Sequence, residues 1–479
     1  MAKDQMLKKL EKEPIGRLLL QYSLPAVIGL AAVSAYNIID SIFVGQWCSP
    51  YAVAALGLIF PVMNLTVAFG TLVGLGTAAT ASITLGQHDY PRAFRVLGHC
   101  VVLGIITGLL VGWAPLPWLH EILAFFGARG EALEEAYNFM YVIMLGFPVS
   151  TCFLNLNHLM RASGYPRKAM MSLLITMVVN LAAAPIFMRV FDMGVAGAAW
   201  ATIAAQAVGL VWVLLHYFNS RNLLHFRRGI YKLNGRIVRR ILTVGLPPCL
   251  LNVCGCLITV VYNHLFLEFD GDMGVGAFGA VNRTLFFFVM IVLGIAQGVQ
   301  PIAGYNLGMG KFTRVRRVLR IALIAAFVIS TIGFALVQLF PREILELFAK
   351  EQDANATKLI DLGAKGVVLF SYFFPLVGVQ VIISNFFQAI GRPVMSIFLS
   401  LTRQLLCLLP CLFILPRLFG EDGIWLSQSV SDLISVALSL VVLRLYLSHY
   451  MPKKDHALSR IHDEEPGSAE PQTPESRHA

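Results

Sequence analysis

The sequence is poor in charged residues and rich in apolar ones. Only 13% of its 479 residues are Asp, Glu, Lys or Arg, against roughly 25% in soluble proteins, whereas 57% are hydrophobic. This composition excludes a disordered chain and a disulfide scaffold, and it argues against a soluble enzyme. The net charge of +10 is concentrated at the ends of apolar runs, so membrane topology explains it and we expect no nucleic-acid partner.

The sequence also lacks the short motifs of metal sites, nucleotide sites and proteases. Neither close pair of cysteines, at 254/256 and 407/411, has the spacing of a zinc site. The run GYNLGMGKFT at 304–313 resembles a phosphate loop, but five residues separate its outer glycines and Phe312 stands where Ser or Thr should follow the lysine. His-Glu at 120–121 lacks the second histidine of a metalloprotease. We expect no enzyme, no resident metal and no cofactor.

Long apolar runs are what the sequence does contain. A helix needs about 20 residues, at about 1.5 Å each, to cross a hydrocarbon core of roughly 30 Å. Twelve runs meet this length and predict an all-α membrane protein. Since 1–14 is charged and has no cleavage site, we expect the first helix to be retained. The predicted spans are 15–46, 51–85, 94–118, 132–162, 167–190, 194–218, 237–267, 273–305, 315–340, 357–390, 393–417 and 423–449.

Basic residues occur in every second connection between these runs. The positive-inside rule therefore predicts that both termini lie in the cytoplasm, and an even number of spans agrees. The mixed-charge segment 341–365 is expected to form an external helix, and 455–479, rich in Pro, Glu and Ser, is expected to be disordered. The basic connections are 1–14, 88–95, 161–168, 221–240, 311–320, Arg392 and 453–454.

The chain repeats itself at a nearly constant offset in residue number. Leu-Pro at 24–25 recurs at 246–247, and the pattern from Leu85 to Leu97 recurs at 307–319 with the same offset. Phe-Pro at 147–148 recurs at 374–375, with a slightly larger one. Each half holds six predicted helices, so both halves have the same orientation. We expect two pseudo-symmetric six-helix bundles around a central cleft, which is a transporter architecture.

This repeat divides the chain into five parts. The expected parts are a cytoplasmic N-terminal segment (1–14), an N-terminal six-helix lobe (15–218), a basic cytoplasmic linker (219–236), a C-terminal six-helix lobe (237–449) and a disordered cytoplasmic tail (450–479). Glycines at 104, 108 and 112 form a close-packing face, which we expect to contact another helix of the same chain, and we expect a monomer.

Two motifs resemble those of the multidrug and toxic compound extrusion (MATE) family. The segment PAVIGLAAVSAYNIIDSIFVG at 25–45 is similar to the family's first helix, with its D-x-I-F-V-G run, and GIAQGVQPIAGYNLGMGK at 294–311 is similar to the signature that ends the eighth helix. The resemblance covers essentially the whole chain. It implies a secondary antiporter of the bacterial cytoplasmic (inner) membrane that exports organic cations and other drugs, a function of drug resistance.

The sequence departs from the family at the fifth and seventh helices. Bacterial members often carry Asn, then Asp four residues on, then Pro; here Asn180 and Pro185 are present, but Ala184 takes the place of the carboxylate. The threonine of the sixth helix is kept as Thr202, whereas the glutamate that another branch carries on the seventh helix is replaced near Gly255.

Asp40 is then the main candidate for ion coupling in the first half. A carboxylate within a span costs roughly 2.5–3.5 kcal/mol to insert and is a functional candidate by default. Asn37 lies one turn earlier on the same helix face, and Pro25 earlier in the same span is expected to act as a hinge. We expect ion coupling at Asp40, Asn37, Asn180 and Thr202.

The coupling ion is either a proton or sodium. Sodium wants several oxygen ligands, and Asp40, Asn180 and Thr202 offer a weak site with only one carboxylate. Proton transfer needs a single titratable group, and desolvation favours the protonated form of a carboxyl group. The sequence therefore favours a proton over sodium.

Three further charges lie within predicted spans of the second half. Arg403 and Asp432 sit near the middle of the eleventh and twelfth spans, so we expect them to lie close together or to share a wet cavity. Two roles stay open, a locked structural ion pair and a switching element in coupling. Arg283, on the eighth span, has no obvious partner in sequence. Together with Arg403 it is consistent with an alternative function, a flippase for lipid-linked oligosaccharides. Such a flippase would hold a diphosphate in a basic cavity.

Overall fold

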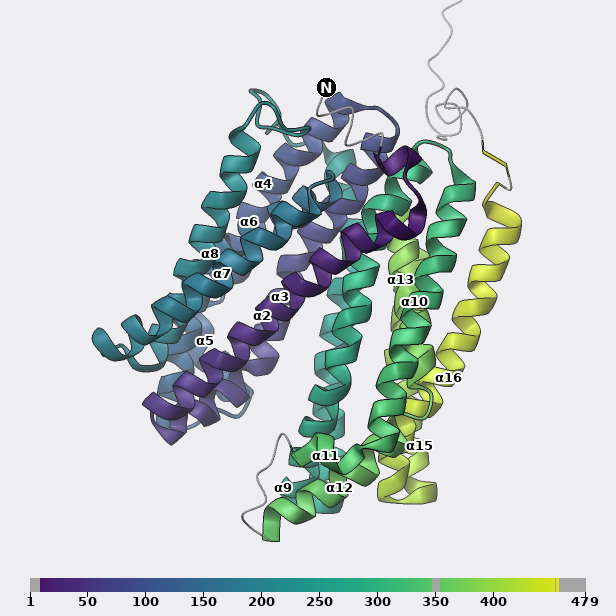
Figure 1. The fold of residues 1–479 in the computed structure, drawn as a ribbon. Helices are drawn as coiled ribbons and strands as arrows, with labels where there is room; N and C mark the ends of the chain where they lie inside the picture. The colour runs from purple at the N-terminus through teal and green to yellow at the C-terminus, as the bar shows by residue number, and fades with distance from the viewer. Residues whose placement is uncertain (1–8, 347–353, 453, 456–479) are drawn as a thin grey trace, which may run out of the picture.

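The computed structural model describes residues 9–346, 354–452 and 454–455 and contains only helices and their connections over these ranges (Figure 1). Short 3-10 or π-helical turns interrupt or extend several helices: η1 (Leu116–Trp118), η2 (Ile186–Val190), η3 (Thr402–Leu408) and η4 (Tyr446–Tyr450). The α-helices are α2 (Ile15–Trp47), α3 (Pro50–Gly86), α4 (Tyr90–Gly112), α5 (Leu119–Phe125), α6 (Glu131–Ala162), α7 (Pro166–Pro185), α8 (Gly194–Phe218), α9 (Gly235–Gly308), α10 (Phe312–Leu339), α11 (Pro341–Glu346), α12 (Ala354–Phe370), α13 (Phe374–Ala389), α14 (Pro393–Leu401), α15 (Leu409–Phe419) and α16 (Glu421–Leu445).

Over the described residues, eleven segments are long and apolar enough to cross a membrane, and a bent pair of helices supplies a twelfth. The expected all-α membrane fold is therefore confirmed. α9 contains two spans, joined at Gly271, whose φ of 64° and ψ of −152° break the helix where the chain reverses. The sequence anticipated this boundary between its seventh and eighth spans.

The predicted bounds of the tenth span, 357–390, agree with the bent pair Thr357–Phe370 and Phe374–Ala389, but the expected external helix before it is wrong. The external helix expected at 341–365 is instead α11, which ends at Glu346, and α12, which begins at Ala354 and belongs to the span; 347–353 lie outside the described residues. The span itself is broken, because α12 and α13 meet at 58°. Pro375, near the start of α13, has no N–H with which to continue a helix from α12.

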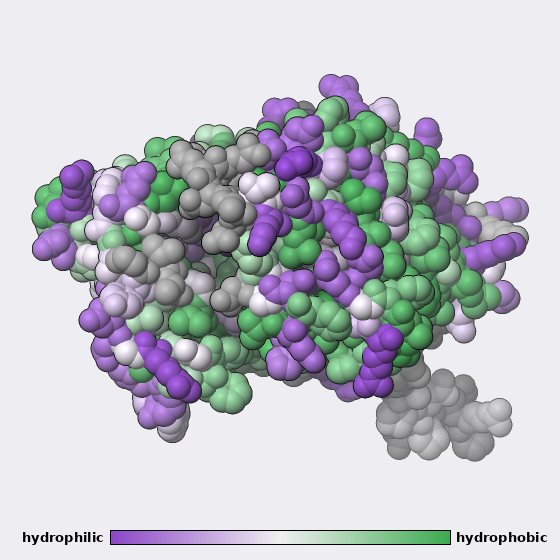
Figure 2. Space-filling model, turned by 90° about the horizontal axis from the view of Figure 1, so that it is seen from below, coloured by the Kyte–Doolittle hydropathy of each residue, from purple (hydrophilic) through white to green (hydrophobic). Residues whose placement is uncertain are grey.

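Three hydrophobic cores hold the helices together. One is shared by both halves and includes Leu10, Leu85 and Tyr305; a second lies only in the first half, around Val44; a third lies only in the second half, around Trp425. The helices of the two halves meet near the end that carries the N-terminus and separate toward the opposite end (Figure 1). Seen from that open end, the surface mixes hydrophilic residues with broad hydrophobic areas (Figure 2).

The shared core closes because glycines let two helix backbones touch. At the ends of α3 and α9, a Cβ added to Gly86 would collide with the carbonyl of Tyr305, and one added to Gly308 would collide with the carbonyl of Ile83. Positions 86 and 308 correspond under the internal repeat, and so do positions 83 and 305. The repeat therefore converts each of these two contacts into the other. The seam between the lobes is therefore pseudo-twofold symmetric.

A second pair of glycine contacts obeys the same repeat. A Cβ on Gly76 would collide with Ile241 and crowd Gly245 on α9, and a Cβ on Gly298 would collide with Ser23 on α2. Since position 76 corresponds to 298 and position 23 to 245, the α3–α9 and α9–α2 contacts are equivalent. Only residues without a side chain allow this approach on both sides of the axis.

The glycine face of α4 packs within the chain, as expected. A Cβ on Gly108 would lie 2.5 Å from Cα of Pro148, and one on Gly112 would lie 2.6 Å from the carbonyl oxygen of Met144, both on α6. This face is therefore used inside the first lobe.

The basic connections gather at the end that carries the N-terminus. Lys311 donates to Glu11 over 2.8 Å, which holds the pKa of that carboxyl below its usual range. Arg314 donates to the backbone carbonyls of Leu10 at 3.1 Å and Glu13 at 2.8 Å. The segment before α2 is thus fastened to the start of α10, and it links the first lobe to the second.

Alanine at position 76 tests the seam between the lobes. Gly76→Ala should lower the melting temperature of the purified protein by several degrees, because overpacking costs typically about 1–3 kcal/mol. Gly57→Ala, in the same helix and with no atom within 4 Å of its added Cβ, is the control and should melt as wild type or higher. Equal melting of the two variants would contradict a seam that depends on bare backbone.

Candidate functional site

Helices α2, α7 and α8 of the first lobe bring three polar side chains together. The carboxylate of Asp40 accepts a hydrogen bond from Nδ2 of Asn180 at 3.2 Å and another from Oγ1 of Thr202 at 3.4 Å, both at Oδ2. Asn180 also lies 3.3 Å from Thr202, which in turn bonds the carbonyl of Ala198. Side chains that are far apart in the sequence therefore form one cluster around a carboxylate.

Two acceptor oxygens of this cluster receive no hydrogen bond from any described residue. Oδ1 of Asp40 and Oδ1 of Asn180 are buried, and neither has a hydrogen-bond partner among the residues that the structure describes. Asn180 is fully buried and Asp40 is half-buried. A buried oxygen left without a partner costs free energy. Two such oxygens in one cluster suit a cation, either a proton on the carboxyl group or a metal ion between the oxygens.

Asn37 does not join the cluster. Its side chain is exposed, and its backbone carbonyl accepts a bond from Ser41 at 2.9 Å. The residue that does lie nearby is Tyr36, one turn before Asp40, which is buried and bonds Gln206. Helical spacing could have indicated Tyr36 and Gln206, because each lies four residues from a residue of the cluster, Asp40 and Thr202 respectively. The resemblance to family motifs did not point to either residue.

Two other expected features of this lobe can be located. Pro25 is buried within α2, and α2 runs as one helix from Ile15 to Trp47. Ala184, which replaces a carboxylate of the family pattern, is fully buried on α7 in the core of the first lobe. No second carboxylate therefore enters at that position.

The second lobe contains a buried ion pair. Nε of Arg403 donates to Oδ1 of Asp432 over 2.9 Å, and Gln428, one turn earlier on α16, donates to the same oxygen at 2.9 Å. Asp432 is 2% exposed. The expected proximity of the two charges is confirmed, while Gln428 was not anticipated.

A π-helical turn positions the arginine. Arg403 lies in η3, and the hydroxyl of Ser431 donates to its backbone carbonyl at 2.9 Å. Pro410 follows shortly after, near the start of α15, and cannot donate to the carbonyl one turn before it. Membrane helices accommodate such prolines by local π turns and side-chain donors, and the wider turn here aims the guanidinium at α16.

Arg283 stands apart from both clusters. It is exposed on α9, and its side chain makes no hydrogen bond or ion pair with any residue that the structure describes.

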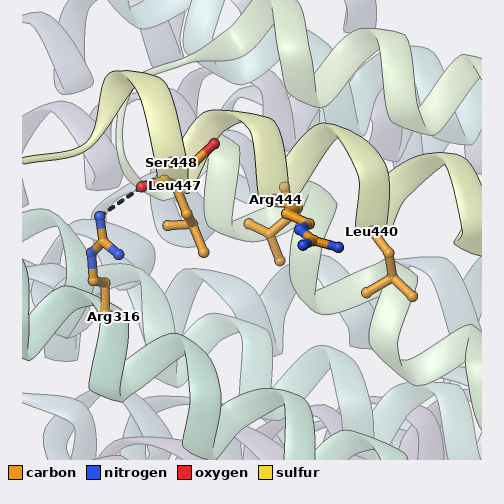
Figure 3. A pocket seen from close by; sticks show the side chains of 6 residues that line it. Arg316, Leu440, Arg444, Leu447 and Ser448 are labelled. Atoms are coloured by element: carbon orange, nitrogen blue, oxygen red, sulfur yellow. Dashed lines mark hydrogen bonds between the residues drawn. The ribbon is translucent and has the colours of Figure 1, made fainter. Parts of the chain in front are cut away.

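A hydrophobic groove of about 500 Å³ lies elsewhere, between α10 and the end of α16 (Figure 3). Leu440, Leu443 and Leu447 line it, and the guanidinium of Arg316 donates at 2.7 Å to the backbone carbonyls of Leu447 and Met451. Arg316 therefore caps η4, the π-helical turn that follows α16. The groove shares no residue with either polar cluster.

Comparison with known proteins gives consistent matches over nearly the whole chain. The family model MatE matches residues 25–186 and 245–414, one segment in each half. The multidrug export protein MepA of Staphylococcus aureus (strain MSSA476) is 27% identical over 443 residues, which cover 92% of this chain and 96% of the relative. MepA of Staphylococcus haemolyticus (strain JCSC1435) is 24% identical over the same shares.

Solved structures share the fold. A MOP superfamily transporter from Pyrococcus furiosus matches with a TM-score of 0.87 at 24% identity, over 92% of this chain and 97% of that one. An outward-facing multidrug resistance MATE family transporter matches with a TM-score of 0.85 at 24% identity, over 93% and 97%. The two-lobed fold is thus a known transporter fold.

Removing one partner of the buried ion pair should destabilise the second lobe. Asp432→Asn leaves the guanidinium of Arg403 without a counter-charge, which typically costs about 3–5 kcal/mol. The double variant Arg403→Met with Asp432→Leu should recover most of this loss, because it leaves no charge unpaired. Melting temperatures of the purified single and double variants test this.

The transport activity of the double variant then separates the two roles. A stable double variant that still transports indicates a locked structural pair, and a stable one that does not transport indicates a switching element. If Asp432→Asn melts with wild type, the pair contributes no stability and the account of it is wrong.

Proposed function

This chain belongs to the MatE family and is a multi-span membrane transporter, and we propose that it is a secondary antiporter that exports organic cations and other drugs. The names of its relatives support this substrate class, since MepA of S. aureus is a multidrug export protein. We place the transporter in the cytoplasmic membrane of a bacterium, with both termini in the cytoplasm. The alternation of basic connections supports that orientation.

The observation that carries the proposal is the cluster around Asp40, in which two acceptor oxygens have no partner among the described residues. A proton bound by Asp40 neutralises the carboxylate and gives the cluster the donor that it lacks. Sodium would instead use the oxygens of Asp40, Asn180 and Thr202 as ligands, but with a single carboxylate to balance its charge. We therefore propose a proton as the coupling ion, with sodium less favoured.

Coupling needs the cluster to change the shape of the cavity. Protonation removes the charge that holds Asn180 and Thr202 toward α2, and α2 contains a proline between the seam and the cluster. We propose that α2 bends about Pro25 when the proton binds. Solved MATE structures with this fold include one in a bent conformation and one in a straight conformation.

The flippase alternative is less well supported by the charges. Arg403 is neutralised by Asp432 in a buried pair, so it offers no free charge to a diphosphate. Only Arg283 of the two arginines then stays available to line a basic cavity. Drug export is therefore the better proposal.

Ethidium accumulation tests the export function and the role of Asp40 together. Bacteria that lack their own pumps should accumulate less ethidium when they produce the wild-type protein. With Asp40→Asn at the same protein level, accumulation should return to that of cells without the transporter, since an amide cannot exchange the coupling proton. Fluorescence of cell-bound ethidium is the measurement.

A matched control carries the same chemical change outside the cluster. Asp192→Asn, in the exposed turn before α8, should export as well as wild type, since asparagine also adopts the positive φ of 51° found there. Export by Asp40→Asn equal to wild type would contradict coupling at this cluster, and accumulation unchanged by wild type would contradict drug export.

A further inference from the structure

A polar cavity of about 440 Å³ lies between the start of α4 and the start of α9, at the end of the molecule that carries the N-terminus. It belongs to neither polar cluster described above. One wall comes from the first lobe and the other from the segment that opens the second. The polar residues that line it are Asp89, Arg92, Arg95, Asn234, Arg236 and Arg240.

The cavity gathers positive charge that its own lining does not neutralise. The side chains of Arg92, Arg95 and Arg236 make no hydrogen bond or ion pair with any described residue. The one carboxylate in the lining, that of Asp89, accepts the backbone N–H of Arg92 at 3.0 Å and so caps α4. Like charges around one cavity repel each other. The positive-inside rule explains their sign, but it does not require four guanidinium groups to converge.

The backbone around the cavity is fixed in place. The N–H of Asn234 donates to Nε2 of the fully buried His99 at 2.7 Å, and Nδ1 of His99 donates to the carbonyl of Arg95 at 2.7 Å. Asn234 in turn accepts the N–H of Arg236 at 3.0 Å and caps α9. Two helices therefore begin at the cavity, and their N-terminal N–H groups and dipoles favour an anion there.

The internal repeat shows how the equivalent site is filled in the second half. Arg92 corresponds to Arg314 under the repeat, and Arg314 bonds the backbone carbonyls of Leu10 and Glu13. Close by, Glu11 forms an ion pair with Lys311. The chain's own N-terminal segment therefore supplies the oxygen acceptors and the negative charge at this second site.

The first-half cavity receives no such acids. The residues that correspond to Glu11 and Glu13 are Leu233 and Gly235, and the same segment adds Arg236 to the cavity. The second-half site thus receives acids from the N-terminal segment, while the first-half cavity has Asp89 in place of Lys311 and gains Arg236. Among the residues that line the first-half cavity, the carboxylate of Asp89 is the one negative charge, against four guanidinium groups.

We propose that this cavity binds a phosphate-type anion, supplied either by the headgroup of an anionic phospholipid or by a free phosphate compound. Guanidinium groups bind phosphate oxygens through paired N–H donors, and basic pockets between membrane helices on the cytoplasmic side hold lipid headgroups. Arginines of both lobes reach the cavity, so the bound anion bridges the lobes at their closed end. It favours the arrangement in which this end stays together.

Binding to the purified full-length protein in neutral detergent tests the proposal in two arms. Native mass spectrometry compares added phosphatidylglycerol with phosphatidylcholine, and calorimetric titration measures binding of inorganic phosphate. The test variant is Arg95→Gln with Arg236→Gln, one exposed arginine from each wall. The control is Arg221→Gln with Arg228→Gln, which removes the same charge from exposed positions of the linker outside the cavity.

We expect wild type and the control to bind alike, and the test variant to bind at least about tenfold more weakly, because it loses the charge-assisted hydrogen bonds of two guanidinium groups. Loss of phosphatidylglycerol alone identifies a lipid headgroup, loss of inorganic phosphate alone identifies a free anion, and loss of both supports either source. Equal melting temperatures of the two double variants exclude misfolding. Absence of binding to wild type in both arms, equal binding of phosphatidylcholine, or an equal loss in the control would overturn the proposal.

Discussion

Direct contact between helix backbones at the seam is the constraint on which the rest of the structure depends. Gly86 against Tyr305 and Gly308 against Ile83 allow α3 and α9 to meet without side chains between them. Any side chain there would push the lobes apart at the end that they share. Because the contact obeys the internal repeat, the two lobes meet through equivalent surfaces. Away from the seam, each lobe has a hydrophobic core of its own, so the two lobes can differ in structure there.

Each lobe contains a buried or half-buried carboxylate in a polar cluster, but the two are treated differently. Asp432 is fully compensated, with Arg403 and Gln428 donating to it. Asp40 receives only the neutral donors Asn180 and Thr202 and keeps an oxygen without a partner among the described residues. A carboxylate that is already paired with a positive charge gains little free energy from binding a cation, whereas an unpaired carboxylate in a membrane span gains much more. We therefore propose that the coupling ion binds in the first lobe.

The sequence predicts much of this architecture because the bilayer restricts the choices. Apolar run length predicted the spans to within a few residues for most helices, and the repeat predicted the two lobes. The break between α12 and α13 was missed, since a proline within a membrane span is common and its bend depends on neighbours. Asn37 was placed with Asp40 by helix spacing, but the face toward α7 and α8 is set by packing, which put its side chain outside. The cavity between α4 and α9 was not foreseen, because it forms between residues 92 and 236, which only the folded chain brings together.

The central claim is that Asp40 carries the coupling proton and gives it up when substrate binds. The most direct measurement is the release of protons when ethidium is added to the purified transporter in a lightly buffered solution with a pH-sensitive dye. Wild type should release protons in proportion to the ethidium bound, and Asp40→Asn should bind ethidium without releasing them. Equal release by the two proteins would contradict the claim and move the proton to another group.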